Sequence, residues 1–243
     1  MIDVIGIVIS DTPYRETSKL IKILTKEYGV ISCIAKGART LKSELRTVSN
    51  KLTYATFHIH YKEGSLSTLI SGDIIDSLKE IRKDIEKITY ASFILDLTEQ
   101  VSKQSKREEI FDLMISSIKK INEGYDNLVI TNILELKYLD FLGVMPILNE
   151  CSVCGSTSSI ATLSSHKGGY ICNNCLTNEF IVDEKTIKLI RMFYYVDIDK
   201  ITNIKVSNIV KKEINNFLDD YYDTYTGIYL KSKIFLNQLN KIN

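Results

Sequence analysis

Four cysteines in the second half of the chain carry its most specific chemical signal. Cys151 and Cys154 form one C-x2-C pair, and Cys172 and Cys175 form another. Each pair turns the backbone so that two sulfurs converge, and two pairs complete a tetrahedral Zn²⁺ site with Zn–S distances of about 2.3 Å. Because a closed four-cysteine shell leaves no position for water, the zinc is expected to be structural and not catalytic. The spacing therefore predicts one Zn²⁺ in a ribbon module at about residues 150–178.

The same cysteines permit two other interpretations. Two disulfides would require an oxidising compartment, whereas the sequence begins Met-Ile-Asp-Val and lacks the basic and apolar regions of a signal peptide. A thioredoxin-like redox pair would need a βαβ pattern around it, and no such pattern is visible. The fifth cysteine, Cys33, lies in an apolar run and is predicted to be a small core residue.

Composition places the chain among globular proteins. Of its 243 residues 44% are hydrophobic, and no apolar stretch reaches the roughly 18 residues of a membrane helix. Without a targeting signal, a cytoplasmic location and no membrane partner are expected. The formal net charge is only +1, but residues 15–51 hold nine lysines and arginines against three glutamates. This basic stretch is a candidate nucleic-acid surface, although ordinary solvated charges give the same pattern.

Period-two patterns predict five short strands in the first 76 residues. In one of them Tyr54, His58 and His60 share a face, and Phe57 on the opposite face is expected in the core. Antiparallel, turn-linked strands of this length suit an oligonucleotide-binding (OB) barrel or an open sandwich. The predicted strands cover residues 3–10, 19–25, 30–35, 51–62 and 66–71, with Asp11-Thr12-Pro13 as the breaker after the first.

From residue 77 the hydrophobic period changes to 3.6, which predicts a helical domain. Ser105 and Glu108 have the spacing of a capping box, and Asp183 and Ser207 are expected N-caps of two later helices. The predicted architecture is an α+β multidomain chain. A five-stranded OB-fold barrel at residues 1–76 is followed by an α-helical domain at 77–243 with the four-cysteine zinc ribbon inserted in it.

Motifs that indicate catalysis are missing. The sequence contains no phosphate-binding glycine loop, no H-E-x-x-H and no G-x-S-x-G. A zinc deaminase is also disfavoured, because His166 is not followed by x-Glu and no proline precedes Cys172. His58 and His60 have no third ligand nearby, so a barrel-wall position is favoured over a metal site. The sequence therefore predicts a non-enzymatic binding protein without a small-molecule substrate.

OB barrels bind single strands through a basic groove and stacked aromatic rings. Tyr14, Tyr28 and Tyr54 are the aromatic candidates here. The segment at residues 36–51 offers cations that can neutralise phosphates, which predicts backbone binding and not sequence-specific readout. Those cations are Lys36, Arg39, Lys42 and Arg46.

Several blocks of the sequence resemble one known family. They are residues 14–29 (YRETSKLIKILTKEYG) with 34–39 (IAKGAR), residues 136–146 (LKYLDFLGVMP) leading into the first cysteine pair, residues 168–175 (GGYICNNC), and residues 227–236. In this order, and over nearly the whole length, they are similar to the bacterial recombination mediator RecO.

The resemblance implies a non-enzymatic role in recombinational DNA repair, in the cytoplasm and at the bacterial nucleoid. RecO proteins bind single- and double-stranded DNA, anneal strands, and with RecR help RecA displace the single-stranded-DNA-binding protein. The low net charge predicts a modest, strongly salt-dependent affinity for DNA. DNA contacts on the barrel are implied for Arg15, Lys19, Lys22, Lys36, Arg39, Lys42 and Arg46. Candidates for binding a protein partner on the helical domain are Lys211, Lys212, Lys231 and Lys233.

Three other functions stay open at this level. The first is a zinc-ribbon adaptor that binds proteins and whose barrel never touches DNA. The second is an enzyme with an unrecognised site. The third is a zinc-ribbon transcription factor, which would show a sequence preference that phosphate contacts cannot supply.

Overall fold

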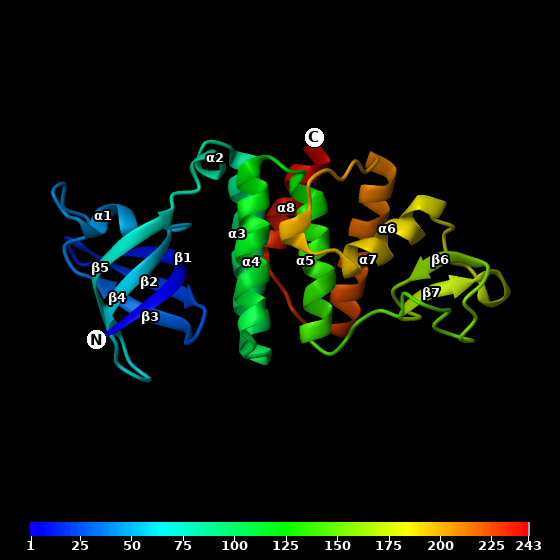
Figure 1. The fold of residues 1–243 in the computed structure, drawn as a ribbon, viewed down its shortest axis with the longest axis horizontal. Coiled ribbons are helices and arrows are strands. Elements are labelled where there is room, and N and C mark those ends of the chain that lie inside the picture. Colours follow the sequence, from blue (N-terminus) through cyan, green and yellow to red (C-terminus); the bar gives the residue numbers. More distant parts are fainter. Residues whose placement is uncertain (243) are drawn as a thin grey trace. The chain divides into compact units, whose positions relative to one another are not determined.

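The computed structural model describes residues 1–242, apart from the side chains of residues 237 and 239–242. The chain forms two compact units. Unit 1 contains Met1–Glu123 together with the C-terminal segment that begins at Ser232, and unit 2 contains Gly124–Lys231. Unit 1 holds a β-barrel and the helices that follow it, and unit 2 holds the two cysteine pairs (Figure 1).

A closed five-stranded barrel forms the N-terminal part of unit 1. Its strands follow the order β1-β2-β3-β5-β4, and β1 closes the ring by pairing with β4. All neighbours are antiparallel except β3 and β5, which pair in parallel, and a short helix lies between β3 and β4 in the sequence. This is the OB barrel predicted from the sequence. The elements are β1 (Ile2–Tyr14), β2 (Ser18–Thr25), β3 (Gly29–Ala35), α1 (Leu45–Val48), β4 (Tyr54–His60) and β5 (Ser67–Asp76).

The barrel core is formed by the alternate side chains of each strand that point inward. On β4 the alternation is strict, since Ala55, Phe57 and Ile59 are fully buried while their neighbours are not. Phe57 and Cys33 both belong to this core, which confirms the prediction for each. Helix α1 packs on β5 where Gly72 leaves room, because a Cβ at that position would lie 2.7 Å from Val48.

Three strand boundaries differ from the prediction by three or more residues, and the others by at most two. β1 runs through Asp11-Thr12-Pro13 to Tyr14, so the expected strand end at residue 10 was wrong. From Ser10 on, this strand pairs with β2 but not with β4, and a proline without an N–H donor is tolerated where one side of the strand is open. β5 also continues past residue 71 to Asp76, and β4 begins at Tyr54 and not at residue 51.

The helices of unit 1 follow the barrel directly. Asp84 caps the long helix α3, because its carboxylate accepts hydrogen bonds from the backbone N–H groups of Glu86 and Lys87. Ser105 is the C-cap of α3 and α4 begins only at Glu108, so the predicted capping box at Ser105 was wrong. The elements are α2 (Lys79–Arg82), α3 (Ile85–Gln104), α4 (Glu108–Glu123) and, from the C-terminal end of the chain, α8 (Lys231–Ile242).

Unit 2 combines three helices with a small β-hairpin. Asp183 accepts a hydrogen bond from the N–H of Lys185, and Ser207 accepts one from that of Val210. The structure therefore confirms the two predicted N-caps. The elements are α5 (Asn127–Phe141), β6 (Ile160–Ser164), β7 (Gly169–Cys172), the 3₁₀ turns η1 (Asn173–Cys175) and η2 (Ile198–Lys200), α6 (Glu184–Tyr195) and α7 (Asn208–Tyr225).

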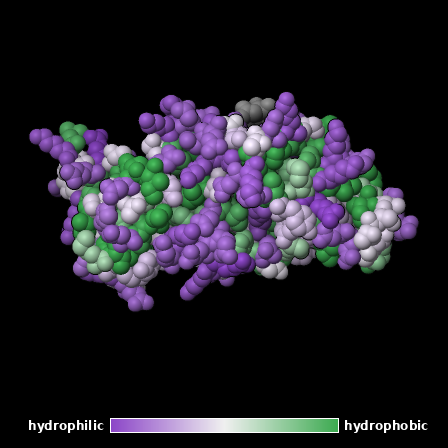
Figure 2. All heavy atoms as spheres, in the orientation of Figure 1, coloured by the Kyte–Doolittle hydropathy of each residue, from purple (hydrophilic) through white to green (hydrophobic). Residues whose placement is uncertain are grey.

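The surface mixes charged and apolar side chains. Several aliphatic residues of the barrel are partly exposed, among them Ile5, Ile70 and Ile74. Figure 2 shows hydrophobic residues at the barrel surface between hydrophilic ones. Among the helices of the described chain, none has the length and apolar character needed to cross a membrane.

The barrel wall carries a histidine held between two carboxylates. Nδ1 of His58 lies 2.7 Å from Asp3 and Nε2 lies 3.0 Å from Asp73. The hydrogen bonds to Asp73 and Asp3 raise the pKa of His58 above its usual value. When the ring is protonated, it can donate to both carboxylates and so ties together β1, β4 and β5 at this point.

We expect His58→Gln to destabilise the barrel at mildly acidic pH and to matter less as the pH rises. Because the pKa of His58 is raised in the folded protein, the wild type has its full extra stability over the variant below the unfolded-state pKa of about 6.5. This extra stability is lost as the pH rises through the folded-state pKa. Urea unfolding from about pH 5 to pH 9 measures this difference. His60→Gln on the same strand is the control, and an equal loss at every pH would contradict the assignment.

Candidate metal centre and nucleic-acid interface

The sulfurs of the four paired cysteines converge on one point. All four Sγ atoms lie within 4.8 Å of one another, and those of Cys154 and Cys172 are 3.6 Å apart. A tetrahedron of sulfurs around Zn²⁺ has edges of about 3.8 Å, whereas a disulfide requires about 2.05 Å. Within the described chain this is the only group of three or more His, Cys or carboxylate ligands with metal-binding geometry. The arrangement could hold one metal ion.

Two backbone turns bring the sulfurs together. In the first turn, the N–H of Gly155 donates to the carbonyl of Cys151, and the N–H of Cys151 donates to that of Ser156. The second pair lies at the end of β7, where the chain enters η1. The N–H of Cys172 points at the sulfur of Cys151, with a distance of 3.4 Å. Two of the four sulfurs belong to buried residues, so the centre is partly shielded from solvent.

The pKa values of the clustered thiols favour the binding of a cation. Burial opposes ionisation of Cys151, but backbone N–H groups, that of Cys172 first, bring its pKa down to about 6. The pKa of Cys175 rises to about 12, because of its contact with Cys154 and then because of burial. One thiolate in the cluster therefore makes further thiolates unfavourable. A divalent cation removes this repulsion, which matches the chemistry of the donor set.

The hairpin around the cysteines is anchored to the helices of unit 2. The Tyr170 hydroxyl donates to the carbonyl of Ile187 on α6, and Tyr225 on α7 donates to the carbonyl of His166 at 3.2 Å. Nζ of Lys167 binds Glu179, which lowers the pKa of that carboxyl to about 2. Sequence reasoning did not single out these anchors, because each pairs a residue of the module with a distant partner.

The predicted DNA contacts of the barrel fall into two groups. Five of them lie on the β1–β2 turn and on the segment that follows β3. The backbone N–H of Arg39 donates to the carbonyl of Thr17 at 2.8 Å and its guanidinium to that of Arg15 at 3.1 Å, so the two segments are joined. We call this cluster the basic rim. Its members are exposed and make no ion pair with a described residue: Arg15, Lys36, Arg39, Lys42 and Arg46.

The other two predicted contacts are already engaged. Nζ of Lys19 lies 2.9 Å from Asp11 and 2.6 Å from the side-chain oxygen of Asn50, and only 14% of its side chain is exposed. Lys22 forms an ion pair with Glu99 of α3 at 3.4 Å. These two lysines therefore do not share the open character of the basic rim.

The three tyrosines predicted to stack with bases have different neighbours. Arg15 covers the ring of Tyr14, with its guanidinium carbon 5.3 Å from the ring centre. Tyr28 is half exposed and lies against Tyr61, with ring centres 5.6 Å apart. Tyr54 faces Nζ of Lys119 on α4 at 5.5 Å. Tyr14 is thus the candidate that lies next to the basic rim.

The four lysines proposed for partner binding lie on two helices. Lys211 and Lys212 belong to α7, where Lys211 forms an ion pair with Asp126 at 2.8 Å. Lys231 and Lys233 belong to α8, and Nζ of Lys233 lies 4.8 Å from the ring centre of Phe93.

The fold and the cysteine cluster define an OB-barrel protein with a helical region and a four-cysteine metal-binding module. The family model for the Recombination protein O N terminal matches residues 1–78, and that for the Recombination protein O C terminal matches residues 82–234. The chain belongs to the RecO family.

Relatives of this family agree over nearly the whole length. The chain is 37% identical to the DNA repair protein RecO of Bacillus mycoides (strain KBAB4) over 240 residues. It is 38% identical to the proteins of the same name from Bacillus cereus (strain AH187) and Bacillus anthracis. Each match covers 97% of this chain and 96% of the relative.

We expect Cys172→Ser to remove the bound metal and to unfold the module around it. Because the sulfur of Cys172 is buried among the other three, its loss opens the donor set, and metal binding is linked to folding. Metal content and thermal melting of the purified variant measure both effects. Cys33→Ala, in the barrel core, should change the melting but leave the metal content alone. A Cys172→Ser protein with normal metal and melting would refute the four-cysteine site.

Gly169→Ala is expected to weaken metal retention without touching a ligand. Gly169 has a φ of +150°, and a Cβ there would collide with the backbone of Ile147, which pairs with this end of β7. The hairpin that carries Cys172 would have to shift. Release of metal to a chelator should accelerate in this variant. Gly143→Ala, outside the cysteine module, is the matched control, because its φ of +72° is strained but nothing lies within 4 Å of the added carbon. Equal rates of metal release from the two variants would contradict the role of Gly169.

Proposed function

We propose that this RecO-family chain binds single- and double-stranded DNA through the basic rim and acts as a recombination mediator in DNA repair. The observation that carries the proposal is the rim itself. Its five cations project from two joined loops of an OB barrel and have no carboxylate partner among the described residues. Exposed cations of this kind gain most from phosphate, because binding releases the counterions of DNA.

The contacts proposed here act on the phosphate backbone and carry no sequence information. Such binding suits a protein that brings complementary strands together, so we propose that the chain promotes annealing and, with RecR, the loading of RecA. We place it in the cytoplasm at the nucleoid. We propose that it acts by binding, without turnover of a substrate, since the sequence lacks a phosphate-binding glycine loop, H-E-x-x-H and G-x-S-x-G.

The metal is proposed to be one Zn²⁺ with a structural role. Four thiolates form a soft, closed donor set that suits zinc and leaves no position for a water ligand. Bound zinc would supply the charge that lets the four sulfurs ionise together. The residues of the chain do the rest, because the turn at Cys151 and the end of β7 hold the sulfurs in place.

Contact with the single-stranded-DNA-binding protein is proposed for the helical part of the chain. Lys212 on α7 and Lys231 at the start of α8 are exposed, whereas Lys211 is held by Asp126. We therefore expect Lys212 and Lys231 to contribute more to binding an acidic partner than Lys211.

If the chain were instead a protein adaptor whose barrel does not touch DNA, substitutions in the basic rim would leave DNA binding unchanged. Fluorescence anisotropy of labelled single-stranded DNA should show binding by the wild type that weakens in Lys36→Ala/Arg39→Ala/Lys42→Ala. Losing three phosphate contacts should lower the slope of log affinity against log salt by about 2, at about 0.7 per contact. The matched control removes three exposed cations elsewhere, Lys83, Lys188 and Lys200. Equal binding by all three proteins would favour the adaptor.

A further inference from the structure

Strand β2 presents a row of residues on the outside of the barrel. Ile21 and Ile23 point into the core, so Lys22 and Leu24 point outward, and Lys26 follows at the end of the strand. In OB barrels the face around strands 2 and 3 is the one that takes up nucleic acid. The β2 row, defined as Lys22, Leu24 and Lys26, is thus placed where a DNA strand would lie.

Helices α3 and α4 of the same unit cover this row. Lys22 forms an ion pair with Glu99 of α3 at 3.4 Å. Lys26 donates to both carboxylate oxygens of Asp112 on α4, each at 2.9 Å. Between the two lysines, Leu24 is 1% exposed although it points away from the barrel core. Both ends of the row are therefore held by carboxylates.

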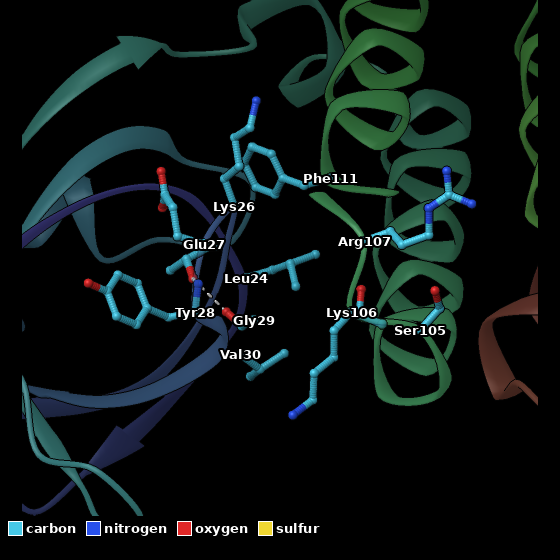
Figure 3. Close-up of a pocket in the computed structure, with 12 residues that line it drawn as sticks. Leu24, Lys26, Glu27, Tyr28, Gly29, Val30, Ser105, Lys106, Arg107 and Phe111 are labelled. Atoms are coloured by element: carbon cyan, nitrogen blue, oxygen red, sulfur yellow. Dashed lines mark hydrogen bonds between the residues drawn. The ribbon is translucent and has the colours of Figure 1, made fainter. Parts of the chain in front are cut away.

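The contact between the row and the helices is loosely packed. A cavity of about 320 Å³ lies between the β2–β3 hairpin and the connection from α3 to α4, and it is lined by Leu24, Val30 and Phe111 among others. Figure 3 shows the Lys106 side chain on the helical side of this space, opposite the hairpin. Both ion pairs are partly open to water. Exposed ion pairs around a cavity hold two surfaces together only weakly.

We propose that the β2 row is a second DNA-binding surface, which Glu99 and Asp112 occupy in the absence of DNA. The two carboxylates take the positions that phosphate oxygens would take. The lysines are four residues apart, or about 13 Å along a strand. That distance spans about four phosphates of a stacked strand at 3.4 Å per nucleotide. The inference rests on the proposed function, because it extends the DNA surface from the basic rim along β2.

The test compares single-stranded DNA binding by the wild type and by Glu99→Gln/Asp112→Asn. The double variant releases Lys22 and Lys26, and also Lys103, whose Nζ lies 3.6 Å from Glu99 on the same helix. With Lys22 and Lys26 free, the affinity for an oligo-dT probe should rise about fivefold to tenfold, and the salt slope should steepen by about 1.4. Both replacements keep the size of the side chain. The single variant Asp112→Asn changes only the more exposed of the two carboxylates. It should show a smaller gain in affinity, and it takes the place of the double variant if that protein folds poorly.

Two charge-matched variants separate local contact from a general change in charge. Adding Lys22→Ala/Lys26→Ala to the double variant restores the wild-type net charge and should abolish the gain. Adding Lys188→Ala/Lys200→Ala restores the same net charge with exposed lysines of unit 2 and should leave most of the gain. No gain in the double variant, or equal loss in both charge-matched variants, would overturn the proposal.

The rim variant, measured in parallel, distinguishes the two proposals. If Lys36→Ala/Arg39→Ala/Lys42→Ala weakens binding while Glu99→Gln/Asp112→Asn changes nothing, the second surface is wrong and the proposed function stands. If the rim variant binds normally while the double variant gains affinity through Lys22 and Lys26, DNA binding belongs to the β2 row and the rim assignment fails. Absence of binding at low salt by every variant overturns both.

Discussion

The parallel pairing of β3 with β5 is the constraint on which the barrel depends. It is short, joining Cys33 and Ile34 to Ser67 and Thr68, and it turns an open antiparallel sheet into a closed ring. Closure buries the side chains on one face of every strand, and those on the other face point outward. The outward set includes the β2 row, and the loops at the strand ends include the basic rim. The position of each cation thus follows from a pairing that contains no charged residue.

The cations of the barrel surface differ in whether they are paired with a carboxylate, and this matters more than their number. The whole chain has a net charge of +1, so a uniform surface would attract DNA only weakly. Acidic partners are not spread evenly, however. Lys19, Lys22 and Lys26 each face a carboxylate, whereas the five cations of the basic rim pair with none in the part of the chain that the structure describes. A nearly neutral protein can therefore offer one locally cationic surface, and its attraction for a polyanion depends on which ion pairs exist and not on its composition.

Sequence patterns predicted the features that arise within a short stretch of chain. The C-x2-C spacing, the alternation around Phe57 and the caps at Asp183 and Ser207 all depend on residues a few positions apart. The continuation of β1 through Pro13 was missed, since it depends on which neighbour strand β1 lacks. The pairs that hold the β2 row join residues that are 77 and 86 positions apart. No local pattern contains such information, so Lys22 looked as free as Lys36.

The cysteine cluster and the basic rim obey the same electrostatic rule with opposite signs. Four sulfurs within 4.8 Å cannot all ionise without a cation, and two of their residues are buried, so a counterion bound there would become a permanent part of the fold. The cations of the rim are all exposed, so water and salt screen them, and the proposed phosphate ligand would have to compete with that screening. Burial therefore decides which counterion stays and which exchanges. We therefore expect a metal in the cysteine cluster to stay with the fold, and a phosphate ligand of the rim to exchange with salt.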